Sequence, residues 1–217
     1  MRSHVRRIAQ LSVGLVLFGF STALMVRSQL GLAGWDVLHQ GLAERTGLSI
    51  GHVVIAAGAL VLLAWIPLRQ RPGVGTVSNV VVVGFAADAG LAVLPAPGAL
   101  ASRSALLAAG ILLNGIATGL YVGAGLGPGP RDGLMTRFAA RTGRSLRRVR
   151  VLIEVAVLLA GWLLGGSVGV GTVAFAVAIG PLAQAFITRF AVPDPAGTAP
   201  ADATTDHPER TDPCPAF

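Results

Sequence analysis

The chain has 217 residues, of which 53% are hydrophobic and only 12% charged, and its formal net charge is +7. So little charge excludes an ordinary soluble domain and fits a chain that is solvated by lipid. All 17 basic residues are arginine and Cys214 is the only cysteine, which excludes an intrachain disulfide and a phosphate-loop lysine.

Six apolar stretches are long enough to cross the hydrocarbon core of a membrane as helices. The first follows a basic start at residues 1–7 and could pass for a signal peptide, but the same pattern recurs in mid-chain, so we interpret it as a membrane span. We expect spans at about 8–26, 50–68, 74–94, 104–122, 149–168 and 170–190.

The segments between these spans are polar. A short amphipathic helix is predicted after the first span and again after the fourth, with Asp36 and Asp132 in the respective first turns. Residues 95–102 form a short linker. Residues 191–217 are rich in Pro, Ala, Thr and Asp and predict a disordered tail.

The chain repeats itself at a fixed offset. Residues 7–91 pair with 103–187 without a gap, 96 positions apart, and more than a third of the pairs are identical. Arg45-Thr46-Gly47 matches Arg141-Thr142-Gly143, and Gly73-Val74-Gly75-Thr76 matches Gly169-Val170-Gly171-Thr172. This pattern predicts a tandem duplication, with repeat 1 at 8–94 and repeat 2 at 103–190.

Three spans in each copy and a short linker require the second copy to enter the membrane upside down. We therefore expect an all-α polytopic membrane bundle of six spans in a 3+3 inverted repeat. With both termini in the cytoplasm, 14 arginines fall on the cytoplasmic side and 3 outside. That bias obeys the positive-inside rule and predicts a multi-pass protein of a bacterial plasma membrane.

Several longer motifs resemble a known family. LGPGPRDGLM, WDVLHQGL, the two GVGT turns and GWLLGG are similar to those of the YczE-like integral membrane proteins of bacteria, which are related to the YitT and YyaS families. The resemblance covers about residues 6–190. It implies a multi-span plasma-membrane protein and supplies neither a reaction nor a substrate.

Polar side chains inside the apolar spans are the candidate solute or proton site. A charge that faces lipid costs at least about 2.5 kcal/mol, so these groups should face the bundle interior or an aqueous cavity. The alternative is interhelical hydrogen bonding. The candidates are Asp88, Glu154, Asn79, Asn114 and Gln184.

Asp36 and Asp132 occupy the same position of the two repeats, after a glycine-rich turn. They could act as a pair of acids that binds a solute or proton from opposite faces. Alternatively, each carboxylate could cap its own amphipathic helix, a contribution of roughly 1 kcal/mol. The sequence leaves both interpretations open.

One helical face at the cytoplasmic surface is strongly basic. It predicts attraction to the bilayer and its anionic lipid headgroups, or docking of an acidic cytoplasmic protein, rather than nucleic-acid binding. The face consists of Arg137, Arg141, Arg144 and Arg148.

The sequence favours a small secondary-transporter-like protein that moves a small solute between its inverted halves. The alternative is a non-transporting accessory protein that recruits a cytoplasmic partner through the basic face. The histidines lack ligand spacing, and no motif indicates a catalytic residue, a metal or another cofactor. We therefore do not expect an enzyme.

Overall fold

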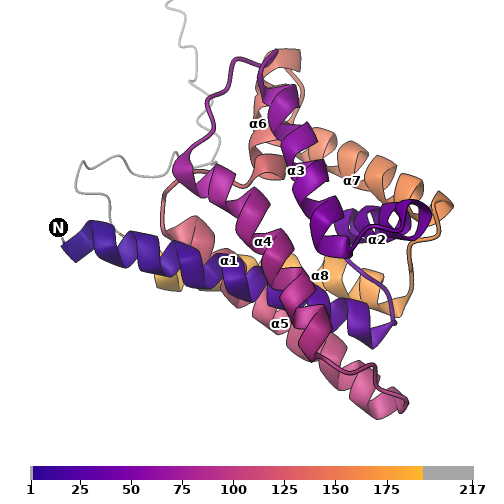
Figure 1. Cartoon of the computed structure of the whole chain (residues 1–217). Helices are drawn as coiled ribbons and strands as arrows, with labels where there is room; N and C mark the ends of the chain where they lie inside the picture. Colours follow the sequence, from indigo (N-terminus) through magenta and orange to yellow (C-terminus); the bar gives the residue numbers. More distant parts are fainter. Residues whose placement is uncertain (1, 193–217) are drawn as a thin grey trace, which may run out of the picture.

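The computed structural model describes residues 2–192, and this part of the chain is entirely helical (Figure 1). The expectation of an all-α protein is confirmed. The predicted tail lies almost wholly outside the described residues. In chain order the helices are α1 (Arg2–Ser28), α2 (Gly34–Thr46), α3 (Ile50–Trp65), α4 (Val74–Val93), α5 (Leu100–Gly123), α6 (Pro130–Thr142), α7 (Leu146–Leu163) and α8 (Val170–Phe190).

Among the described residues, four helices (α1, α4, α5 and α8) are long and apolar enough to cross a membrane, and α2 with α3 could form a fifth, broken span bent by 114°. Alone, α3 has 16 residues, about 24 Å of helix, which is short of a hydrocarbon core. Charged residues occupy the first half of α7, including Arg150 and Glu154. The structure thus has four or five candidate spans, and the six-span arrangement stays a prediction.

Helices α1 and α5 pack against each other, with α4 against α1 and α8 against α5. Glycine permits these close contacts: a Cβ at Gly19 would lie 2.4 Å from the Val83 carbonyl oxygen, and one at Gly119 would lie 2.5 Å from the Phe186 Cβ. Small residues at helix crossings are typical of membrane bundles.

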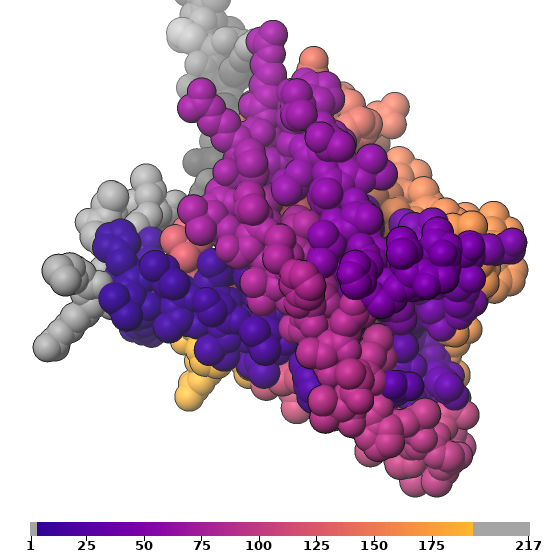
Figure 2. Space-filling model, in the orientation of Figure 1, coloured from indigo at the N-terminus to yellow at the C-terminus, as the bar shows by residue number. Residues whose placement is uncertain are grey.

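Many large apolar side chains on α1, α3 and α4 are exposed, as expected where lipid covers the surface. Figure 2 shows the face of the molecule on which these three helices lie. Examples are Val13, Val16, Leu60, Leu63, Val81 and Phe85.

The short helices pack across the two halves of the chain, α2 on α7 and α6 on α3. The loop that leads into each is held by the first turn of a long helix from the other half. The amide of Gly171 donates to the Leu30 oxygen at 2.8 Å, and that of Gly75 donates to the Leu126 oxygen at 3.0 Å. These two bonds fix where α2 and α6 begin.

Corresponding helices start 96 positions apart: α2 and α6 at residues 34 and 130, α3 and α7 at 50 and 146, α4 and α8 at 74 and 170. Their surroundings differ. Helix α3 packs along α4, where a Cβ on Gly84 would lie 2.6 Å from the Gly51 oxygen, whereas one on Gly180 of α8 meets nothing within 4 Å.

Candidate functional site

The site is built around the first turns of α2 and α6. Each carries an acid there, Asp36 or Asp132, where the positive end of the helix dipole favours a carboxylate. The residues at the helix caps, Ala33 and Gly129, make no side-chain cap bond. The Trp65 indole donates to the Pro130 oxygen at 3.1 Å, which ties the start of α6 to α3.

Asp36 is buried, with 5% of its surface exposed, and contacts two neighbouring side chains. The Thr22 hydroxyl of α1 donates to Oδ2 at 3.4 Å, and the Nδ1 atom of His39, one turn further along α2, lies 3.3 Å from Oδ1. Its carboxylate therefore joins α1 to α2.

Arg131 links the two short helices. Its Nη2 atom lies 3.4 Å from the Nε2 atom of His39, and its guanidinium carbon lies 4.7 Å from the centroid of the Trp35 ring, in a cation–π arrangement. Since a guanidinium can only donate, Nε2 must accept and Nδ1 then carries the proton toward Asp36. This geometry fits a neutral His39.

The electrostatic surroundings of Arg131 combine burial with opposite charge. Burial lowers the pKa of its guanidinium from the ordinary value, and the carboxylates of Asp36 and Asp132 oppose that change, as does Glu154. The positive charge of Arg131 is thus held between acids that come from three different helices.

Asp132 and Glu154 complete the arrangement. The hydroxyl of the buried Tyr121, on α5, donates to Oδ2 of Asp132 at 3.3 Å. A Cβ at Gly34 would lie 3.3 Å from Oε2 of Glu154, so the α7 carboxylate approaches the first residue of α2. We call this set the central cluster; its members are Asp36, His39, Tyr121, Arg131, Asp132 and Glu154.

Of the five in-span candidates, Glu154 alone belongs to this central cluster. Asp88 accepts hydrogen bonds from the Ser49 hydroxyl and, at 2.8 Å, from the Gly51 amide, and its Oδ2 lies 3.5 Å from His52. It therefore holds the first turn of α3.

The three amide candidates lie apart from one another. Asn114 is buried and donates to the Ser21 hydroxyl at 2.9 Å, joining α5 to α1. Asn79 is partly buried on α4, and Gln184 is exposed on α8. The contact of Asn114 is the interhelical hydrogen bond that the sequence left as the alternative.

The basic face is divided. Arg137 and Arg141 of α6 donate to the carbonyl oxygens of Leu68 and Pro67, which follow α3. Arg144 and Arg148 are exposed. In the described residues no group of three or more His, Cys, Asp or Glu side chains is placed to hold a metal ion.

Sequence reasoning missed His39, Tyr121 and Arg131. A weak pattern pointed to His39, which lies one turn after Asp36 on the same helix face, and Arg131 directly precedes Asp132. Nothing in the periodicity indicated that the two helix starts meet.

The apolar helices and the charged groups gathered between them define a class: a polytopic integral membrane protein. The chain belongs to a "Family of unknown function (DUF6198)", whose model matches residues 5–188. The expected resemblance to YczE-like proteins is confirmed by the relatives that follow.

An "Uncharacterized protein" of Haemophilus influenzae is 41% identical over 189 residues, covering 87% of each chain. The "Uncharacterized membrane protein YczE" of Bacillus subtilis is 34% identical over 182 residues, 83% of this chain and 82% of its own. The "Uncharacterized protein YyaS" of the same organism is 23% identical over 164 residues, 74% of this chain and 82% of its own. No solved structure matches.

Proposed function

We propose that the chain is a small secondary-transporter-like protein that exchanges a small cation for a proton through the central cluster. The observation that carries the proposal is the gathering of opposite charges, the buried Asp36 with the half-buried Arg131 and Asp132, where α2 and α6 begin, between the two halves of the chain. Ionisable groups inside a membrane protein are costly and commonly line an ion or proton path.

Charge balance favours a cation over an anion. The central cluster holds three carboxylates against one guanidinium, and His39 has the contacts of a neutral ring. Arg150 is exposed one turn before Glu154, and its guanidinium acts on that carboxylate, so it offsets a second negative charge. The remaining negative charge would be offset by a proton or a small cation.

An inverted 3+3 repeat with cytoplasmic termini is part of this proposal. It is supported by the corresponding helix starts and by the crossed loop contacts of Leu30 with Gly171 and of Leu126 with Gly75. In such repeats the solute binds where the halves meet, and one half rocks against the other to alternate access.

Proteoliposomes with trapped pyranine test the proposal. Gradients of sodium, potassium or guanidinium should drive proton movement with the wild-type protein, and Asp36→Asn or Glu154→Gln should abolish it. Asp88→Asn is the matched control, since Asp88 holds α3 outside the central cluster; it should retain flux once inserted. Absence of wild-type proton movement under all three gradients would contradict the proposal.

The second candidate is an accessory protein that recruits a cytoplasmic partner. The exposure of Arg144 and Arg148 favours it, because neither guanidinium is buried against α3. Recruitment predicts that Arg144→Gln with Arg148→Gln loses a co-purifying protein while central-cluster variants keep it. Retention of every partner by the double variant would exclude this function.

A further inference from the structure

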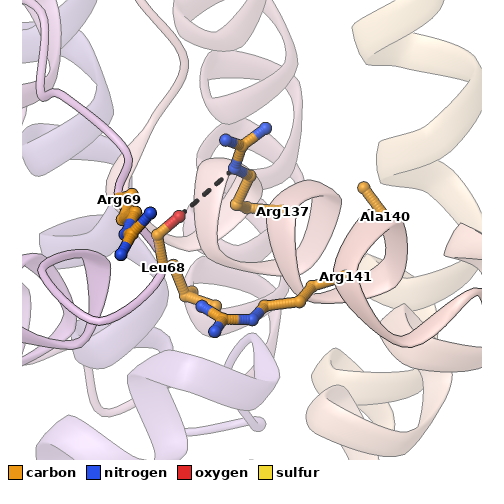
Figure 3. Close-up of a pocket in the computed structure, with 5 residues that line it drawn as sticks. All are labelled: Leu68, Arg69, Arg137, Ala140 and Arg141. Carbon is orange, nitrogen blue, oxygen red and sulfur yellow. Dashed lines mark hydrogen bonds between the residues drawn. The ribbon is translucent and has the colours of Figure 1, made fainter.

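A basic hollow lies between the end of α3 and the helix α6. Its volume is about 450 Å³ and it is lined by Leu68, Arg69, Arg137, Ala140 and Arg141 (Figure 3). A second hollow of about 410 Å³ shares Arg69, Arg137 and Ala140 and adds Gln70, Arg71 and Thr136. Of these described lining residues, four are arginine and none is acidic. A hollow that is lined by positive side chains, with no acidic side chain in its lining, is suited to binding an anion.

Hydrogen bonds hold the arginines of α6 in place. The Nε atom of Arg137 donates to the Leu68 oxygen at 3.3 Å, the bond drawn in Figure 3, and Arg141 donates to the Pro67 oxygen. Each guanidinium has five donors, so each keeps others for a ligand. Fixing the side chains on carbonyl oxygens lowers the entropy cost of binding an anion.

The corresponding place in the first half of the chain explains why the hollow exists. Arg45 of α2 corresponds to Arg141 and likewise donates to a carbonyl oxygen, that of Leu164, at 3.2 Å. Gly41 stands where α6 has Arg137, and a Cβ there would lie 2.6 Å from the Gly161 oxygen. Helix α2 therefore packs tightly on α7, whereas the arginine at this position on α6 leaves an open space.

The other lining arginines also belong to one half only. Gly165 and Ser167 stand where the first half has Arg69 and Arg71, 96 positions earlier. The arginines of the basic hollow therefore lie on one side of the molecule, without counterparts at these two positions of the other half. Under the topology predicted from the arginine distribution, that side faces the cytoplasmic leaflet, which is the anionic one.

Exposed apolar side chains adjoin the arginines along the chain. Ile66, 70% exposed, lies three residues before Arg69, and Phe138, 42% exposed, directly follows Arg137. Leu68 and Ala140 also line the hollow itself, and a phosphate bound by arginines against apolar groups matches a phospholipid, whose acyl chains need such a surface, better than it matches a free ion.

We propose that this hollow is a binding site for the headgroup phosphate of an anionic phospholipid, held by Arg69, Arg71 and Arg137. Arg141 fixes the end of α3 and forms the wall of the site. The proposal does not rest on transport, because the hollow and the central cluster share no residue.

The test uses the full-length protein in neutral detergent and the fluorescence anisotropy of an acyl-labelled phosphatidylglycerol. The variant is Arg69→Asn with Arg71→Gln. Both residues lie in the α3–α4 loop, and asparagine tolerates the positive φ of +52° at position 69. Each arginine near an anionic lipid contributes about a fivefold gain in affinity, so the double variant should bind about 25-fold more weakly.

Arg45→Gln is the matched control, since Arg45 makes the corresponding carbonyl contact but does not line the basic hollow, and the affinity of this variant should be unchanged. Equal weakening by this control would overturn the proposal as a general charge effect. Equal binding of labelled phosphatidylcholine would overturn it too. Displacement of the lipid by inorganic phosphate at the same concentration as by unlabelled phosphatidylglycerol would show a free-phosphate site instead.

Discussion

Trp35 and Arg131 stack on each other across the middle of the protein, and they occupy corresponding positions of the chain, 96 residues apart. Two such residues can touch only if the axis that relates their halves passes between them. The contact fits a twofold relation between the halves, which the proposed inverted repeat would supply.

The first prediction concerns this pair. Arg131→Gln should lower the free energy of unfolding by about 3 kcal/mol, because it leaves the buried carboxylate of Asp36 without its cation. Trp35→Leu should lower the free energy of unfolding by a smaller amount. A double-mutant cycle, measured by unfolding in mixed micelles, should give a coupling energy of about 1 kcal/mol for the stacked pair.

Arg131→Lys is the control, because lysine keeps the positive charge but lacks the planar guanidinium. The free energy of unfolding of this variant should lie between those of wild type and Arg131→Gln. If the losses at the two positions simply add, the side chains do not interact, and the assignment of an axis between them loses its support.

The second prediction compares corresponding glycines in α4 and α8. Gly84→Ala should destabilise the protein by about 1 to 3 kcal/mol because of overpacking, since the added Cβ would lie 2.6 Å from atoms of Gly51 and Ile55. Gly180→Ala meets nothing within 4 Å beyond its chain neighbours, and the helix-propensity gain is opposed by Pro181, which crowds a Cβ on the residue before it, so the change should be about neutral. Thermal unfolding followed by circular dichroism measures both. Equal losses would mean that α8 is packed against α7 as α4 is against α3.

The third prediction concerns Asp88, whose carboxylate accepts a hydrogen bond from the Gly51 amide in the first turn of α3. Asp88→Asn should lower the free energy of unfolding by about 1 kcal/mol. The neutral amide accepts these hydrogen bonds more weakly and loses the favourable interaction of the carboxylate with the helix dipole. The corresponding position is Gln184, which is exposed, so Gln184→Ala should be neutral. A chemical-unfolding midpoint that is unchanged by Asp88→Asn would show that this contact does not hold α3.

Local patterns in the sequence predicted much of the fold, but less of the site. Apolar runs and polar breaks placed the helices, because burial in lipid depends on local hydropathy. The apolar residues around Glu154 also indicated that its charge should face the bundle interior or an aqueous cavity. They could not separate it from Asp88, because the partner of Asp88 is the start of another helix, brought near only by the packing of α3 on α4.

The meeting of Arg131 with Trp35 and His39 could not be predicted for the same reason. It depends on the two loops that are fixed by Gly171 and Gly75 from opposite halves. Backbone contacts of that kind carry no residue preference beyond glycine, which this chain uses in many other places.

The last prediction concerns topology. Thr46 and Thr142 end α2 and α6, occupy corresponding positions and are both exposed. In a variant that lacks Cys214, a membrane-impermeant maleimide added to intact cells should label Thr46→Cys but not Thr142→Cys. Permeabilised cells, in which both sites should react, are the control. Labelling of both from outside, or of neither, would exclude opposite orientations of the halves, because equivalent turns of an inverted repeat must face opposite compartments.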